Sequence, residues 1–330
     1  MPISKTLASA SLAATAIAGS AVALPVEAQA ITPRITRRLD RPPLDRHLWG
    51  IAVLDDGGRL VVGRNADRLF TPASNTKLVV TAAATMLLTP DWTARTSLYG
   101  TGPVRDGVLL GDLILYGRGD PTWSRRCYSV DTLAVGVCSL DAYWALRALA
   151  GQLIRRGIRR VAGAVVGDGS YFEREIVHPT WEVANLVWGY AAPVSGLGFN
   201  ENTITATVAP GLAAGDPAAV TVEPDFADFG IEVRATTNGA GDRNDRLVWS
   251  RAEDGHLQLD GSIRVGAEPT RATLAVSDPA RFAAAALARV LADSAITVGG
   301  GVAGTTDSLV TKAARAGDEL AAVDSRPLAD

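Results

Sequence analysis

Three stretches of the chain space their apolar residues as helices do. Residues 71–89 open with a polar segment and continue as a nearly unbroken apolar run, which predicts a buried helix. Residues 140–158 repeat apolar side chains three and four positions apart, which predicts an amphipathic helix. Its expected core side consists of Tyr143, Leu146, Leu149 and Leu153. Residues 278–291 open with an Asp-Pro pair and continue into an alanine-rich run, which predicts a third helix.

Shorter apolar runs, separated by Gly, Asp and Pro, predict β-structure over most of the remaining chain. Residues 47–63 contain two such runs around an Asp-Asp-Gly-Gly turn, a pattern typical of a hairpin. Residues 161–168 form a buried apolar strand, and residues 211–271 alternate strand-like pieces with turns. Together these patterns indicate an α+β protein in which a hairpin precedes the helix at 71–89.

Length and charge narrow the class of protein and exclude some partners. The chain has 330 residues, of which 47% are hydrophobic and 20% are charged, and this fits one large or two moderate globular domains. A net charge of −3 and a pI near 5.7 provide no general attraction for nucleic acid or for an anionic membrane surface. We therefore expect no nucleic-acid partner.

The first thirty residues have the composition of an export signal. Lys5 precedes the small apolar run 7–24, and residues 28–30 read Ala-Gln-Ala, the form of a cleavage site. We expect residues 1–30 to be a signal peptide, the mature chain to start near Ile31, and the protein to be exported to the periplasm or another extracytoplasmic compartment. An uncleaved anchor is the alternative, but the alanine-rich composition favours cleavage, so no stable membrane anchor is expected.

Two cysteines, Cys127 and Cys138, are the only ones in the chain. Export makes a disulfide between them possible, and closing so short a loop would contribute about 3 kcal/mol if the bond were unstrained. Two cysteines without neighbouring histidines do not predict a metal site.

Ser74 and Lys77 stand at the start of the helix expected from 71–89. Residues three apart lie on one face of a helix, so the hydroxyl and the amine can meet. Only three of the 32 basic residues are lysines, and the arginines that carry the rest of the positive charge cannot lose a proton at working pH. A partly desolvated lysine can be the base that activates a serine. We therefore predict Ser74 as nucleophile and Lys77 as base; an ordinary helix start with a snorkelling lysine is the alternative.

The segment around this pair, PASNTKLVVTAAA, resembles the nucleophile segment of the penicillin-recognising serine enzymes. It is most similar to the D-alanyl-D-alanine carboxypeptidase/endopeptidase family, the class C low-molecular-weight penicillin-binding proteins of peptidase family S13. Residues 109–123, LLGDLILYGRGDPTW, resemble that family's G-x-L-x-L-x-G-x-G-D-P-T-L segment and depart from it only at Trp123.

The resemblance implies a penicillin-binding-protein/β-lactamase-like serine transpeptidase fold interrupted by a large β-rich insertion. We expect residues 31–95 and 272–330 to form the catalytic domain and residues 96–271 to form the inserted region. The implied activity is serine-type D-Ala-D-Ala carboxypeptidase or endopeptidase action on peptidoglycan stem peptides through an acyl-enzyme on Ser74, with β-lactams as covalent inhibitors. No cofactor or metal is implied. The resemblance also implies that Asp120 pairs with a free amine of the substrate, although a carboxylate in a Gly/Pro loop is often only a turn cap.

Two further motifs of that fold, Ser-x-Asn and Lys-Thr-Gly, do not occur in the 330 residues. We therefore expect the chain to be a shortened version of a longer enzyme and its activity alone to be doubtful. A serine β-lactamase is a second interpretation, and a non-catalytic scaffold or cell-wall-binding protein that keeps the fold is a third. The choice between carboxypeptidase and endopeptidase stays open.

Overall fold

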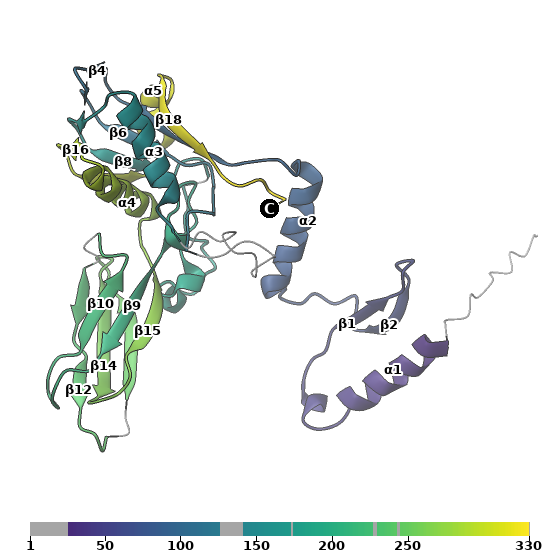
Figure 1. Cartoon of the computed structure of the whole chain (residues 1–330). Helices are drawn as coiled ribbons and strands as arrows, with labels where there is room; N and C mark the ends of the chain where they lie inside the picture. The colour runs from purple at the N-terminus through teal and green to yellow at the C-terminus, as the bar shows by residue number, and fades with distance from the viewer. Residues whose placement is uncertain (1–25, 126–140, 173, 227–229, 243–244, 330) are drawn as a thin grey trace, which may run out of the picture. The chain divides into compact units, whose positions relative to one another are not determined.

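The computed structural model describes residues 26–125, 141–172, 174–226, 230–242 and 245–329. The chain divides into two compact units, residues 1–84 and residues 85–330, which are described separately here as the first unit and the second unit (Figure 1). Within the described ranges, no helix combines the length and the apolar character needed to cross a membrane.

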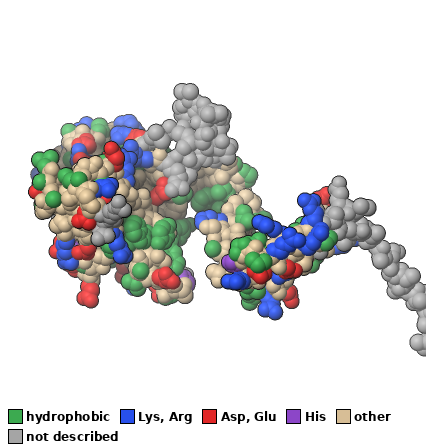
Figure 2. All heavy atoms as spheres, turned by 90° about the horizontal axis from the view of Figure 1, so that it is seen from below, with side chains coloured by type: hydrophobic (Ala, Val, Ile, Leu, Met, Phe, Trp, Pro, Cys, Tyr) green, Lys and Arg blue, Asp and Glu red, His purple; other side chains and the backbone are tan. Residues whose placement is uncertain are grey.

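The first unit contains one long helix and one hairpin. Helix α1 (Val26–Leu39) is followed by a short 3₁₀ turn (Leu44–Arg46) and by strands β1 (Ile51–Leu54) and β2 (Leu60–Arg64). The strands pair antiparallel around the predicted turn, in which the Asp55 carboxylate accepts hydrogen bonds from the backbone N–H groups of Gly57 and Arg59. The hairpin prediction is therefore confirmed. Figure 2 shows Lys and Arg side chains gathered on this unit. The sequence of α1 contains Arg34, Arg37 and Arg38.

Helix α2 (Thr76–Leu87) lies where residues 71–89 predict a helix, and it is preceded by a 3₁₀ turn (Ala73–Asn75). The prediction that this helix is buried is wrong, because none of its side chains is buried and Leu78 is 72% exposed. The physical reason is that, among residues 26–84, the structure has one sheet of two strands, and strand β2 packs on α1.

A five-stranded sheet forms the centre of the second unit, with the strand order β17-β8-β6-β3-β18. Strands β6, β8 and β17 run parallel to one another, whereas β3 is antiparallel to β6 and β18 is antiparallel to β3. The strands are β3 (Arg95–Gly100), β6 (Leu113–Tyr116), β8 (Val165–Asp168), β17 (Val302–Thr305) and β18 (Glu319–Asp324). Helices α3 (Trp144–Arg155) and α4 (Pro279–Asp293) pack on each other and on this sheet, and α5 (Ser308–Arg315) contacts β3.

Strand β6 shows that both faces of this sheet are covered. All four of its side chains are buried, although side chains alternate between the two faces of a strand. Leu113 and Leu115 belong to the large core that includes α3 and α4, whereas Ile114 and Tyr116 belong to a small cluster with Ala314 of α5. A continuous apolar run in the sequence is the expected result of such two-sided burial.

Three smaller sheets complete the second unit and confirm the expected β-rich region. The first has the order β10-β9-β15, the second joins β11, β12 and β13 to β14, and the third has the order β16-β7-β5-β4. Their strands are β4 (Val104–Arg105), β5 (Val108–Leu109), β7 (Arg160–Val161), β9 (Thr203–Ala209), β10 (Ala219–Glu223), β11 (Ile231–Val233), β12 (Thr236–Asn238), β13 (Arg246–Arg251), β14 (Leu257–Arg264), β15 (Thr270–Ala275) and β16 (Thr297–Val298). Short 3₁₀ turns lie at Val183–Asn185, Gly189–Ala191 and Asn200–Asn202.

The two other predicted helices are confirmed, with bounds that differ by up to four residues from those expected. In α3, Leu146, Leu149 and Leu153 are fully buried, while Tyr143 lies at the N-cap and packs against the core. Helix α4 begins with Pro279, and the Asp278 side chain accepts a hydrogen bond from the backbone of Arg281. The predicted strand at 161–168 forms two strands, β7 and β8, separated by a bend.

The expected boundaries at residues 95 and 271 stay a prediction. Residues 272–324 contribute β16, β17 and β18 to sheets that also contain strands from residues 95–168, so they belong to the second unit. Strand pairing holds this segment there, because β8 and β3 would each lose a neighbour if it left the sheet.

Candidate functional site

Ser74 and Lys77 are brought together as their spacing predicts. Ser74 lies in the 3₁₀ turn and Lys77 in the first turn of α2, and the Lys77 ammonium Nζ donates a hydrogen bond of 3.1 Å to Ser74 Oγ. Both side chains are exposed. The distance suits proton transfer between the two groups.

The residue before the serine has an unusual backbone conformation. Ala73 has a φ of +45°, in the left-handed region that side chains with a Cβ rarely occupy. Such conformations cost of order 1–2 kcal/mol and occur often at functional sites. Here it turns the chain into the 3₁₀ turn that presents Ser74.

Asp120 lies in the second unit, on the loop that follows β6. Close packing requires the two glycines of the preceding Gly-Arg-Gly sequence. A Cβ at Gly117 would lie 2.4 Å from the backbone oxygen of Gly196, and one at Gly119 would lie 2.6 Å from the Phe172 ring. Gly119 also has a φ of +88°, which favours glycine.

The Asp120 carboxylate is buried, with 7% of the residue exposed. Its Oδ1 accepts hydrogen bonds from the Thr122 backbone N–H at 2.8 Å and from the Thr122 hydroxyl at 2.7 Å, as a turn-capping aspartate does. Its Oδ2 is buried and has no hydrogen bond within the described residues, and the same holds for Trp123 Nε1. Burial raises the pKa of the Asp120 carboxyl, and the Thr122 hydrogen bonds and the nearby Trp123 N–H oppose the rise.

Asp120 and Trp123 line a cavity of about 470 Å³ in the second unit. Phe172 and Tyr190 contribute aromatic walls, and Glu201 contributes a second carboxylate. A mostly apolar cavity with a few polar groups is the usual form of a small-ligand site. The acidic groups give it the character of a site for a cationic group.

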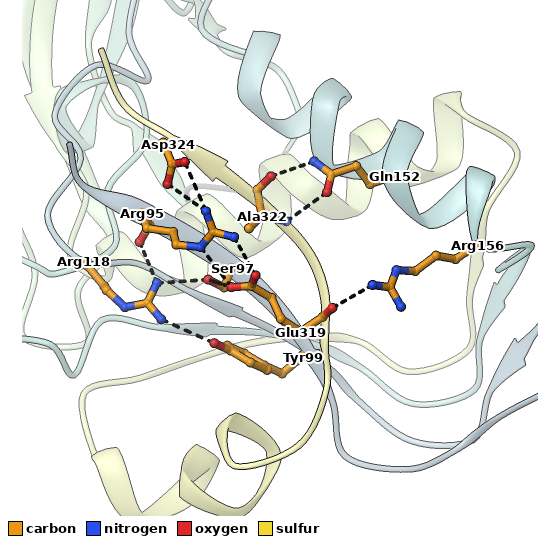
Figure 3. Close-up of polar contacts among 9 residues, drawn as sticks. All are labelled: Arg95, Ser97, Tyr99, Arg118, Gln152, Arg156, Glu319, Ala322 and Asp324. Atoms are coloured by element: carbon orange, nitrogen blue, oxygen red, sulfur yellow. Dashed lines mark hydrogen bonds and ion pairs between the residues drawn. The ribbon is translucent and has the colours of Figure 1, made fainter. Parts of the chain in front are cut away.

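Sequence reasoning missed a polar network beside this loop, shown in Figure 3. Arg118 donates to the Arg95 backbone oxygen at 2.8 Å and to Ser97 Oγ at 3.0 Å. Ser97 Oγ donates in turn to Glu319 at 2.6 Å, and Arg95 forms ion pairs with Glu319 and Asp324. No local pattern could have revealed it, since more than 200 residues separate β3 from β18 in the sequence.

Cysteines and metal-ligating side chains are the remaining candidate features. Cys127 and Cys138 lie outside the described residues, so their predicted disulfide stays a prediction. Within the part of the chain that the structure describes, no group of three or more His, Cys, Asp or Glu side chains is placed to hold a metal ion.

Comparison with known proteins identifies relatives along nearly the whole chain. The D-alanyl-D-alanine carboxypeptidase of Actinomadura sp. (strain R39) is 28% identical over 272 residues, which cover 80% of this chain and 47% of that protein. The D-alanyl-D-alanine carboxypeptidase DacB of Haemophilus influenzae is 23% identical over 312 residues, which cover 93% of this chain and 58% of that protein. The chain therefore spans about half the length of the curated relatives it matches.

Solved structures confirm the predicted fold class. The crystal structure of penicillin binding protein 4 (dacB) from Haemophilus influenzae matches with a TM-score of 0.67 at 21% identity, over 83% of this chain and 55% of that one. The same protein complexed with a novel β-lactam matches with a TM-score of 0.59 at 19% identity, over 83% of this chain and 53% of that one. The chain thus has the α+β fold of a penicillin-binding protein with an inserted β-rich domain.

The sequence profile of the D-Ala-D-Ala carboxypeptidase 3 (S13) family matches residues 31–330. This match covers the Ser74–Lys77 pair, the Gly-Arg-Gly-Asp loop and every strand described above. The chain belongs to the D-Ala-D-Ala carboxypeptidase 3 (S13) family.

Proposed function

We propose that this chain carries the nucleophile of a serine-type D-Ala-D-Ala carboxypeptidase or endopeptidase that acts on peptidoglycan stem peptides. The observation that carries the proposal is the 3.1 Å contact between Lys77 Nζ and Ser74 Oγ at the start of a helix. Family membership supports it, because the profile of this family covers both residues.

The chemistry assigns one role to each side chain. Ser74 Oγ attacks the carbonyl carbon of the penultimate D-alanine while its proton passes to Lys77, which must first be neutral. The carbon–nitrogen bond then breaks, and the departing amine takes the proton from Lys77. Water attacks the resulting ester of Ser74 and releases the shortened peptide. The backbone N–H of Ser74 supplies one donor to the oxyanion.

The base must be desolvated for this step, and this requirement separates the proposal from its alternatives. Lys77 is exposed in the structure. Another surface must therefore pack over Ser74 and Lys77 and exclude water before the lysine can act as a base. A chain without such a cover would be the non-catalytic scaffold that the sequence also allows.

The Asp120 cavity is the proposed place for a free amine of the stem peptide. An ammonium group would give the unpartnered, buried oxygen of Asp120 the charged partner that burial otherwise denies it. Binding would also favour the ionised carboxylate, against the effect of burial that raises its pKa.

Incubation of the purified chain with excess penicillin, followed by intact-mass measurement, tests the catalytic proposal. An adduct of one whole penicillin in the native chain that is absent from Ser74→Ala supports the proposal and shows that the pair can act without the two further motifs. Lys77→Arg is the matched control for charge, because it keeps the cation and removes the base, and we expect it to slow acylation by a factor of about 100 or more.

Two other outcomes favour the alternatives. A folded chain that forms no adduct supports a non-catalytic scaffold. A transient adduct with rapid accumulation of hydrolysed penicillin supports a β-lactamase.

A further inference from the structure

The loop that carries Asp120 has a second charged side chain, Arg118, in different surroundings. Gly119, in its left-handed conformation, separates the two and donates a backbone hydrogen bond of 2.7 Å to Gly196. Asp120 lines the cavity, whereas Arg118 lies over β3 (Figure 3). The loop is thus held on two sides by different contacts.

The planar guanidinium group of Arg118 contacts several groups of β3 and β6 at once. Nη1 donates to the Arg95 backbone oxygen and to Ser97 Oγ, and Nη2 lies 3.4 Å from the Tyr99 hydroxyl. Its guanidinium carbon lies 4.7 Å from the centroid of the Tyr116 ring, within the range of a cation–π contact. A lysine could not make these contacts together, because it has no planar fork of donors.

The residues of β3 that Arg118 contacts are themselves bonded to β18. Ser97 Oγ donates to Glu319 Oε1 at 2.6 Å, and Arg95 donates to the two oxygens of Glu319 at 3.2 and 2.7 Å. Arg95 lowers the pKa of Glu319, so this carboxylate stays ionised near neutral pH. Helix α3 fixes the same strand, because Gln152 exchanges two hydrogen bonds with the Ala322 backbone (Figure 3).

We propose that Arg118 is a positioning residue for Asp120, which fixes the loop at 117–120 to β3 and β18 and so sets the place of the Asp120 carboxylate in the cavity. The role of Asp120 in binding an amine rests on the proposed function. The positioning of Asp120 by Arg118 does not. Arg118 has no carboxylate of its own within 4 Å among the described residues, and its hydrogen bonds go to a backbone oxygen and two hydroxyl groups. Its contacts therefore hold a loop in place and do not form an isolated ion pair.

The test compares Arg118→Ala, Arg118→Lys and Asp120→Asn in the full chain. Arg105→Ala, an exposed arginine of β4 in the same unit, is the control. The first measurement is the pKa of the Asp120 carboxyl by carbon NMR, which needs no ligand. Because burial raises this pKa, we expect it to fall toward the ordinary value in Arg118→Ala, to fall less in Arg118→Lys, and to stay unchanged in Arg105→Ala.

The second measurement is the ratio of dissociation constants for two peptides that end in D-Ala-D-Ala, one with a free side-chain amine and one with that amine acetylated. We expect the native chain to favour the free amine about tenfold, and Asp120→Asn and Arg118→Ala each to lose most of that preference. Thermal unfolding of each variant confirms that it is folded.

The outcomes separate the two ideas. An unchanged Asp120 pKa together with an unchanged preference in a folded Arg118→Ala overturns the positioning inference. A preference that survives Asp120→Asn, or is absent from the native chain, overturns the amine role of Asp120, and the NMR result then still decides whether Arg118 positions this carboxylate.

Discussion

The first unit and the second unit differ in how far their apolar side chains are buried. Among residues 33–84, only Leu39 and Val62 are buried, whereas strand β6 and helices α3 and α4 of the second unit supply a continuous core of fully buried side chains. Yet α2 is more apolar in sequence than α3 or α4. Its side chains Leu78, Val79 and Met86 are each 70% or more exposed. Apolar content alone therefore does not bury a helix, because burial needs a second layer to cover it.

This difference bears directly on the chemistry. Exposed apolar surface of this extent marks a place where another surface packs. A covering surface would remove water from Lys77, which the proposed mechanism requires of its base. The second unit already has its cavity and its buried carboxylate, so the proposed recognition of an amine and the proposed activation of Ser74 place different demands on the two regions.

The largest expected effect is a difference in the free energy of unfolding between two leucine substitutions, one in each region. Leu149→Ala, in the fully buried face of α3, is expected to lower the free energy of unfolding by about 2–5 kcal/mol, because it loses buried surface and leaves a cavity. Leu78→Ala, on α2, is expected to change it by no more than about 0.5 kcal/mol. Urea unfolding followed by circular dichroism measures both. Equal losses would mean that α2 is packed as firmly as α3, and the contrast between the units would be lost.

A smaller effect concerns the network that fastens β18. The hydrogen bonds from Arg95 lower the pKa of Glu319 below its ordinary value of 4.5. A depressed pKa in the folded state gives stability that is present above the unfolded pKa and is lost as pH falls through the folded pKa. Glu319→Gln should therefore cost about 0.5–1 kcal/mol at neutral pH, and the cost should shrink as the pH falls below about 4.5.

Exposed Glu268 supplies the control for this measurement, and Glu268→Gln should show no such dependence. Urea unfolding of the native chain and both variants at several pH values gives the curves. A cost for Glu319→Gln that is the same at all pH values would show that the hydrogen bonds, and not the charge, hold the strand.

The smallest effect concerns the strained residue of the first unit. Ala73→Gly removes the penalty of a left-handed alanine, of about 1–2 kcal/mol, but adds chain entropy in the unfolded state, of about 0.5–1 kcal/mol. The expected result is a gain of about 0.5 kcal/mol, visible as roughly twofold slower amide hydrogen exchange at the start of α2. Ala83→Gly, inside the same helix, should instead lose about 1 kcal/mol. Faster exchange in Ala73→Gly would show that the left-handed conformation costs nothing at this position.

Several features of the site could be predicted because they depend on neighbours in the sequence. The contact between Ser74 and Lys77 follows from a spacing of three at a helix start. The turn cap of Asp120 on Thr122 follows from its place in a Gly/Pro loop. The three helices and the hairpin follow from apolar periodicity and from their cap residues.

Other features depend on which segments meet, and the sequence alone could not decide them. The exposure of α2 means that no described part of the first unit covers it, which periodicity within the helix does not report. The boundary at residue 84 reflects the pairing of β17 and β18 with strands that lie more than 130 residues earlier in the chain. Arg118 in the sequence is one arginine of many, and only the fold brings it to Ser97 and, through Ser97, to Glu319.

The sequence by itself determined the contact between Ser74 and Lys77, the family resemblance and the order of helices and strands, because each of these depends on residues close together in the chain. The tertiary structure alone decided which apolar surfaces are covered, how deeply Asp120 is buried and what holds its loop. Those properties arise from contacts between distant segments, whose free energy depends on the packing of the whole unit and not on any local pattern.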